Sequence, residues 1–165
     1  MTATVNPIPQ GMHTITPHLV CKDAAAAIEF YKEAFGAVEV DRLAGPGGKL
    51  MHAMLRIGDS SLMLVDEFPE MQVRAPQSIG GSSVTIHLAV VDADAAFKRA
   101  TDASTLSETY CNYASFLAGA GRSEEARAWA ERILAKKATM PNYLRRRERP
   151  WFRKAKAVLN SLPQK

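Results

Sequence analysis

The chain has 165 residues, of which 47% are hydrophobic and 23% are charged, a composition that excludes a wholly disordered chain and suits one or two globular domains. It lacks a run of about 18 apolar residues, and residues 1–11 lack a charged segment followed by an apolar one, so the sequence predicts neither a transmembrane helix nor a signal peptide. The net charge of +4 is uneven, because residues 1–100 hold 8 Lys/Arg and 11 Asp/Glu whereas residues 101–165 hold 13 and 6.

We therefore expect a cytoplasmic location without membrane contact.

Cys21 and Cys111 lie far apart in the sequence and belong to no Cys-x-x-Cys or Cys/His cluster. We therefore interpret them as small buried hydrophobic residues, not as a disulfide or zinc ligands.

The first predicted elements are a strand, a helix and three further strands. Residues 13–21 are typical of a half-buried strand, after which Asp23 is the expected N-cap of a helix that Gly36 ends. The apolar stripe of this helix consists of Ala27, Phe30, Tyr31, Ala34 and Phe35. Residues 37–43, 49–58 and 60–67 are the expected strands, and the turn-forming segments GPGG and GDS separate them.

The strand and the helix then recur at an offset of 69 residues, after a loop rich in Pro, Gly and Ser at residues 68–83. Seven identities carry the repeat: Thr16, His18, Leu19, Asp23, Ala24, Ala26 and Ala27 reappear as Thr85, His87, Leu88, Asp92, Ala93, Ala95 and Ala96. The repeat predicts that residues 83–100 begin a second copy of the same unit.

These segments resemble a known superfamily. ITPHLVCKDAAAAIEFYKEAFGA and GGKLMHAMLRIGDSSLMLVDEFPE, followed by the second strand and helix from Val84, are similar to the vicinal-oxygen-chelate (glyoxalase/bleomycin-resistance) superfamily, and most of all to its PhnB-like branch. The resemblance covers residues 13 to 100. It implies an α+β domain at residues 1–102 in which two strand–helix–three-strand (βαβββ) units close around a small-molecule cleft, with the second unit incomplete here.

Enzymes of that superfamily hold a divalent metal with His, Glu or Gln side chains on the first and last strands of their units. Counting from Asp23, the resemblance places Thr16, Met63 and Thr85 at these positions. A hydroxyl or a thioether is a poor ligand for such an ion. We therefore predict no metal, no other cofactor and no catalytic residue.

Three histidines remain as candidates for a role in the cleft. His18 and His87 share a strand face with Thr16 and Thr85 by period-two alternation, and His52 lies on a neighbouring predicted strand. They could contact a ligand, bind a metal in an arrangement foreign to the superfamily, or serve only as hydrogen-bonded strand residues. The predicted ligand-binding set is Thr16, His18, His52, Met63, Thr85 and His87.

From residue 103 the pattern becomes helical and departs from the superfamily, whose members continue with strands. Two helical patterns at residues 106–137 are separated by GAGRSEE, where Gly121 ends the first helix and Ser123 starts the second. Their spacing resembles one tetratricopeptide (TPR) repeat, and the rest, with Pro150 at a helix start, resembles the closing helix of a repeat array. The predicted apolar stripes are Tyr110, Tyr113, Ala114 and Leu117, then Ala126, Ala130, Ile133 and Leu134, and finally Trp151, Ala155, Val158, Leu159 and Leu162.

Residues 103–165 also indicate which partners the protein could bind. A lone repeat and an incomplete second unit leave an apolar face and a sheet edge uncovered, so we expect a homodimer. Residues 136–156 contain nine Lys/Arg against one acid, Glu148, which suggests an acidic protein partner. Nucleic acid is not expected, because aromatic interleaving is limited to Tyr143, Trp151 and Phe152 and no nucleic-acid motif is present.

The predicted function is the binding of a small molecule in the β-sheet cleft without metal-dependent catalysis. Two alternatives stay open. One is a helical, TPR-like protein-interaction module on a non-catalytic scaffold, and the other is a metal-dependent lyase or dioxygenase.

Overall fold

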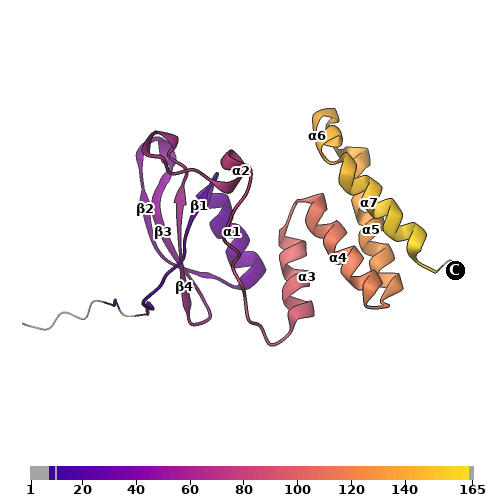
Figure 1. The fold of residues 1–165 in the computed structure, drawn as a ribbon, viewed down its shortest axis with the longest axis horizontal. Helices are drawn as coiled ribbons and strands as arrows, with labels where there is room; N and C mark the ends of the chain where they lie inside the picture. Colours follow the sequence, from indigo (N-terminus) through magenta and orange to yellow (C-terminus); the bar gives the residue numbers. More distant parts are fainter. Residues whose placement is uncertain (1–7, 10, 164–165) are drawn as a thin grey trace, which may run out of the picture. The chain divides into compact units, whose positions relative to one another are not determined.

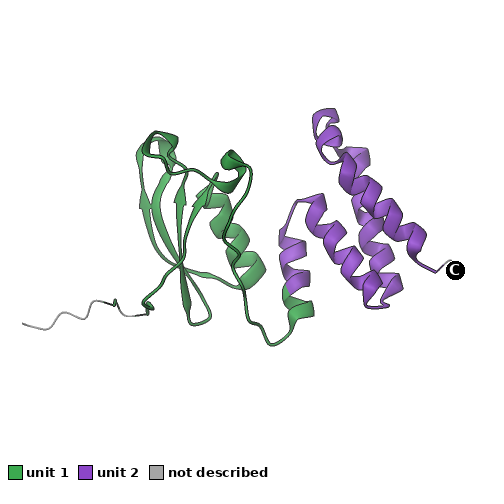
Figure 2. Cartoon of the chain, viewed as in Figure 1, with its two compact units in different colours: residues 1–96 green, residues 97–165 purple. Residues whose placement is uncertain are grey.

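The computed structural model describes residues 8, 9 and 11–163 and divides into two compact units, residues 1–96 and 97–165 (Figure 1 and Figure 2). The division falls inside α3 (Ala93–Ala103), whereas the sequence predicted a boundary after residue 102. Most of residues 1–11, where the sequence predicts no signal peptide, lie outside the described residues. None of the described helices is long and apolar enough to cross a membrane.

The first unit is built on a four-stranded sheet in the order β1-β4-β3-β2. Its strands are β1 (His18–Cys21), β2 (Val38–Ala44), β3 (Leu50–Ile57) and β4 (Ser60–Asp66). β1 pairs with β4 in parallel, and the other two pairings are antiparallel. This is the predicted order of one strand, one helix and three strands. β1 is shorter than the predicted strand at residues 13–21 and begins directly after Pro17, which has no N–H to donate to a neighbouring strand.

The helix α1 (Ala24–Phe35) has the predicted ends. The Asp23 side chain accepts a hydrogen bond from the backbone N–H of Ala26 at 2.9 Å. Gly36 ends the helix in the left-handed conformation, with φ at 66°, which a residue without Cβ adopts at little cost. The turn GPGG between β2 and β3 also forms as predicted, as a short 3-10 segment at Pro46–Gly48.

The core of this unit lies between α1 and one face of the sheet. The helix contributes Ala24 and Ile28, and the sheet contributes side chains of β3 and β4, all of them buried. The predicted helical stripe is therefore partly wrong, because Ile28 is fully buried whereas Phe30, Tyr31 and Phe35 are only half-buried. The sheet side of the core consists of Leu50, Ala53, Leu55, Leu62 and Leu64.

The predicted second unit forms only in part. Its helix is present as α3, and Asp92 accepts a hydrogen bond from the N–H of Ala95 at 2.9 Å, as Asp23 does in the first copy. Its strand is absent, because residues 84–90 have no regular secondary structure and Val84 and Ile86 are 63% and 49% exposed. A strand needs a hydrogen-bonded neighbour, and no described strand pairs with this segment.

The second unit is helical. After α3 come α4 (Ser107–Gly119), α5 (Ser123–Thr139), the short α6 (Asn142–Arg147) and α7 (Arg149–Ser161). Gly121 joins α4 to α5 in the left-handed conformation, with φ at 76°, as its position in GAGRSEE predicted. α5 packs against both α4 and α7.

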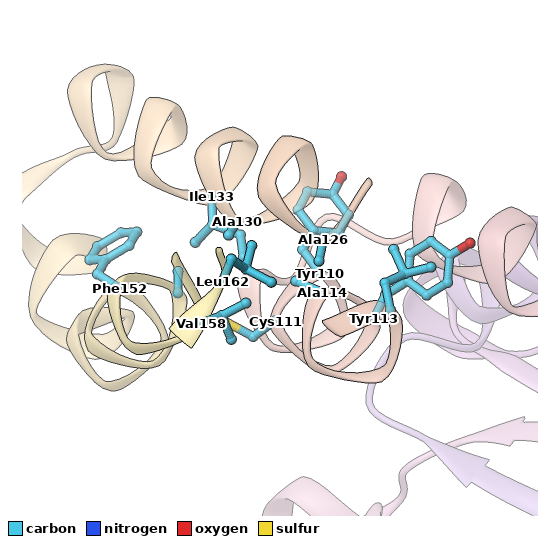
Figure 3. Packing of buried hydrophobic residues seen from close by; sticks show 12 residues of the cluster. Tyr110, Cys111, Tyr113, Ala114, Ala126, Ala130, Ile133, Phe152, Val158 and Leu162 are labelled. Atoms are coloured by element: carbon cyan, nitrogen blue, oxygen red, sulfur yellow. The ribbon is translucent and has the colours of Figure 1, made fainter. Parts of the chain in front are cut away.

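The core of the helical unit follows most of the predicted stripes, and Cys111 and Phe152 are additions to them. Figure 3 shows Ile133 and Ala130 of α5 close to Val158 of α7 and Leu162, which follows it. Tyr110, Tyr113, Ala114, Leu117 and Ala126 are buried in the same cluster. Phe152, which the sequence analysis counted among the aromatic residues of the basic segment, is also buried there.

Candidate functional site

Two histidines and a methionine meet on the sheet face opposite α1. His18 of β1 lies beside Met63 of β4 in the strand register, and Met54 of β3 lies on the other side of Met63. The rings of His18 and His52 are 6.0 Å apart between centroids in an edge-to-face arrangement. Three members of the predicted set, His18, His52 and Met63, are therefore neighbours on one surface. Thr16 lies two residues before β1 and is half-buried.

The surroundings of His18 favour its neutral form. Partial burial, and secondly the proximity of His52, lower the pKa of His18 below its ordinary value of 6.5. A neutral imidazole has one N–H donor and one nitrogen acceptor, so His18 can serve as a hydrogen-bonding group or a weak base at neutral pH.

The donor set does not fit the divalent metal that the resemblance implies for enzymes of the superfamily. The described residues contain no group of three His, Cys, Asp or Glu side chains that could hold a metal ion. Met63 lies beside His18 and offers only a thioether, a soft and weak ligand for such a cation.

A cleft of about 760 Å³ runs along β1 and includes His18 in its lining. Its walls come from β1, from α1 and from the chain between residues 74 and 86. The volume is within the usual range for small-molecule sites. Of the predicted set, Thr16, His52, Met63, Thr85 and His87 are not among the lining residues.

Aromatic side chains of α1 form one wall of this cleft. Phe30 and Tyr31 line it, and their rings contact each other edge to face at 5.7 Å. The sequence analysis placed both in the core stripe of the helix. In the structure Ala24 and Ile28 enter the core, Tyr31 packs against it, and both Phe30 and Tyr31 line the cleft. The predicted core stripe is thus partly confirmed for Tyr31 and wrong for Phe30, which is not part of the core cluster.

The wall formed by residues 74–79 was not predicted, because it comes from a loop. Arg74 and Ile79 line the cleft, and α2 (Pro76–Ile79) is a single helical turn within this wall. The carboxylate of Glu67 accepts hydrogen bonds from the hydroxyl of Ser78 at 2.6 Å and from the N–H of Ala75 at 3.2 Å. These bonds lower the pKa of Glu67 and tie the wall to the end of β4. Arg74 forms no ion pair within the described residues.

Cys21 also lines the cleft, as a thiol and not as a thiolate. Burial, followed by the nearby carboxylates of Asp66 and Asp23, raises its pKa to about 11. The thiolate is the nucleophilic form of cysteine. Cys21 is therefore an apolar part of the wall at neutral pH, and covalent catalysis by its sulfur is not supported.

The segment predicted as the second strand has a different place in this unit. Val84 and Ile86 line the cleft, whereas Thr85 and His87, between and after them, are exposed and do not. The expectation that Thr85 and His87 lie on a strand face beside the other candidates is wrong, because residues 84–90 form no strand.

The fold and the cleft define a small α+β domain with one strand–helix–three-strand unit, and the comparison with protein families agrees. The model of the glyoxalase/bleomycin resistance protein/dioxygenase superfamily matches residues 11–140. Because the match covers more than half of the chain, the protein belongs to this superfamily. The match extends into α5, beyond residue 100, where the resemblance in the sequence ended.

Relatives are found in mycobacteria. An uncharacterized protein of Mycobacterium bovis and one of Mycobacterium tuberculosis are each 53% identical over 92 residues, which is 54% of this chain and 60% and 54% of the respective relative. The chain thus spans a little over half the length of the curated relatives it matches.

Two solved structures are similar to part of the chain. One is a gene product of Arabidopsis thaliana, with 28% identity, a TM-score of 0.44, and coverage of 54% of this chain and 69% of that chain. The other is TioX from Micromonospora sp. ML1, with 21% identity, a TM-score of 0.37, and coverage of 56% and 72%.

Proposed function

We propose that this member of the superfamily, within its PhnB-like branch, binds a small aromatic molecule in the cleft along β1 without metal-dependent catalysis. The observation that carries the proposal is the cleft of about 760 Å³ with Phe30 and Tyr31 on one wall and His18 also in its lining. Aromatic side chains bind a flat ring by stacking or edge contacts and by removing apolar surface from water.

Polar groups in the lining of the cleft indicate which other substituents the ligand carries. Arg74 supplies a guanidinium without an ion pair among the described residues, and neutral His18 supplies one donor and one acceptor. An aromatic ring with a carboxylate or phenolate substituent complements both groups. The ligand class that the cleft favours is therefore a small aromatic acid or phenol.

The experiment is a ligand-observed NMR screen of aromatic acids and phenols against the whole protein, in buffer with a chelator and again with added Zn²⁺ or Ni²⁺. Ile79→Trp fills the cleft from the loop wall, and Met71→Trp is its matched control. Ile79 and Met71 are 62% and 60% exposed, but only Ile79 lines the cleft.

We expect binding in the presence of the chelator, a loss of about tenfold in affinity for Ile79→Trp, and no change for Met71→Trp, since a tenfold loss needs only about 1.4 kcal/mol of displaced contact. Binding that requires added metal would instead support the alternative of a metal-dependent lyase or dioxygenase. The absence of any binding would overturn the proposal.

A second candidate function rests on the helical unit. Phe97 and Phe116 are 41% and 52% exposed, and their rings lie 6.1 Å apart beside the buried Tyr113. Exposed aromatic pairs of this kind are common at protein–protein contacts. If the cleft binds nothing, a TPR-like interaction module that presents this pair is the better proposal, and Phe116→Ser is the variant that should abolish partner binding.

We further propose that the protein is a homodimer. The strand-like segment at residues 84–90 exposes Leu88 and Val90 and has no strand partner among the described residues. A second copy of the chain could supply a paired edge for it.

A further inference from the structure

A second concave site lies within the helical unit, between the end of α5, α6 and the first turns of α7. Its volume is about 430 Å³, and Asn142 and the buried Phe152 contribute to its lining. The other lining side chains are all cationic: Lys137, Arg145, Arg146, Arg149, Arg153 and Lys156. Among the described residues, no acidic side chain lines this pocket.

One of these cations has a structural task. The Arg145 guanidinium donates from Nε to the carbonyl of Met140 at 2.7 Å and from Nη2 to the carbonyl of Ala138 at 3.1 Å. It therefore binds carbonyls at the C-terminal end of α5, where a positive charge is favourable. These bonds hold α6 against α5 and so shape the pocket.

The other five cations, Lys137, Arg146, Arg149, Arg153 and Lys156, are exposed and take part in no ion pair within the part of the chain that the structure describes. Elsewhere in this unit, cationic side chains form ion pairs with carboxylates, as in Lys98–Asp102 and Arg122–Glu125. The one acid of the basic segment, Glu148, is buried and does not line the pocket. The positive charge of the pocket is therefore uncompensated.

The spacing of these cations concentrates their charge on one side of the helices. Arg149, Arg153 and Lys156 are four and then three residues apart on α7, which places them on one helical face. Like charges at such spacings repel one another and oppose helix formation. An anion in the pocket would remove this repulsion, so its binding should also stabilise the fold.

We propose that this pocket binds a small molecule that carries two or more phosphate groups. A guanidinium presents several N–H donors in a planar fork that matches the oxygens of a phosphate, and three of the five free cations are arginines. Five positive charges call for several negative ones in a small volume, which adjacent phosphates provide. A pocket of this volume suits a small molecule and not a duplex or a folded partner.

Isothermal titration calorimetry on the whole chain, at low salt, tests the proposal with tripolyphosphate, ATP and adenosine as probes. We expect tripolyphosphate and ATP to bind saturably with one site per chain, and adenosine not to bind. Tighter binding of ATP than of tripolyphosphate identifies a nucleotide as the ligand class, whereas equal binding identifies an inorganic phosphate chain. Both probes should raise the unfolding temperature of the helical unit.

Two adjacent residues provide a matched pair of variants. Arg146 and Arg147 are consecutive exposed residues in the last turn of α6, but only Arg146 lines the pocket. Arg146→Glu and Arg147→Glu change the net charge equally, and both place a negative charge at the C-terminal end of α6. We expect Arg146→Glu to weaken tripolyphosphate binding at least tenfold and Arg147→Glu to weaken it less than twofold. If Arg146→Glu does not fold, Arg146→Gln with Arg147→Gln is the substitute pair.

Three outcomes overturn the proposal. Equal losses in Arg146→Glu and Arg147→Glu would show general attraction to a basic surface. Tighter binding of a 20-nucleotide single strand would show a nucleic-acid surface, and tighter binding of a poly-glutamate peptide would show a site for an acidic protein. The pocket and the cleft along β1 lie in different units and use different residues, so failure of one proposal leaves the other intact.

Discussion

At the scale of single residues, Asp66 at the end of β4 connects two other elements of the first unit by hydrogen bonds. It is 7% exposed, and its two carboxylate oxygens accept hydrogen bonds from the N–H groups of Ala24 and Leu50, each at 2.7 Å. One side chain thereby joins the start of α1 to the start of β3. Both N–H groups are buried and depend on this acceptor.

We predict that Asp66→Ala destabilises the first unit by about 3 kcal/mol, because two buried donors lose a charged acceptor. Glu70→Ala, which removes an exposed carboxylate from the same unit, should change stability by less than about 0.5 kcal/mol. Both tryptophans lie after residue 100, so amide hydrogen exchange of β3 and β4, and not tryptophan fluorescence, is the suitable measurement. Similar losses in both variants would contradict the role assigned to Asp66.

At the scale of elements, α1 and β2 are linked by a carboxylate with two cations. Glu39 of β2 accepts from Lys32 of α1 at 2.7 Å and also pairs with Arg42 of its own strand. Hydrogen bonds from Arg42 and then from Lys32 lower the pKa of Glu39 from its ordinary value of 4.5 to about 2. A lowered carboxylate pKa means that the link stabilises the folded unit at pH values above 4.5 and is lost as the pH falls towards 2.

We predict that Glu39→Gln costs the first unit less than about 1 kcal/mol at pH 7, since pairs near the surface are screened by solvent. The difference between the variant and the native chain should shrink as the pH falls from 4.5 towards 2. Denaturation curves at several pH values measure it, and Glu33→Gln on the exposed side of α1 is the control. A cost that persists undiminished at the lowest pH would show that Glu39 acts by packing and not by charge.

At the scale of the whole molecule, the proposed homodimer would cover the exposed apolar segment at residues 84–90 of the first unit. The proposed homodimer predicts a mass of about twice 18 kDa by light scattering at micromolar concentration. Leu88→Lys together with Val90→Lys should shift the protein towards the monomer, because both side chains are exposed in this segment. Met71→Lys, at an exposed site elsewhere in the unit, should leave the mass unchanged. A native mass of 18 kDa would refute the dimer.

The sequence by itself determined the local elements of this protein. Asp23 and Gly36 mark the two ends of α1, Asp92 caps α3, and Gly121 separates α4 from α5, because caps and left-handed turns depend on residues within a few positions of one another. The order of strand, helix and three strands and the superfamily were also predictable, since both rest on local patterns.

Only the tertiary structure decided which faces are buried and which residues meet. The rotation of α1 sends Ile28 into the core and Phe30 to the cleft, although both fit an apolar stripe. The segment at residues 84–90 has the pattern of a strand but pairs with no strand among the described residues, because pairing depends on a neighbouring edge that any part of a chain can supply. Arg74 lines the cleft, and Arg146 but not Arg147 lines the basic pocket. Both placements depend on how the elements pack, which the spacing of residues in the sequence does not encode.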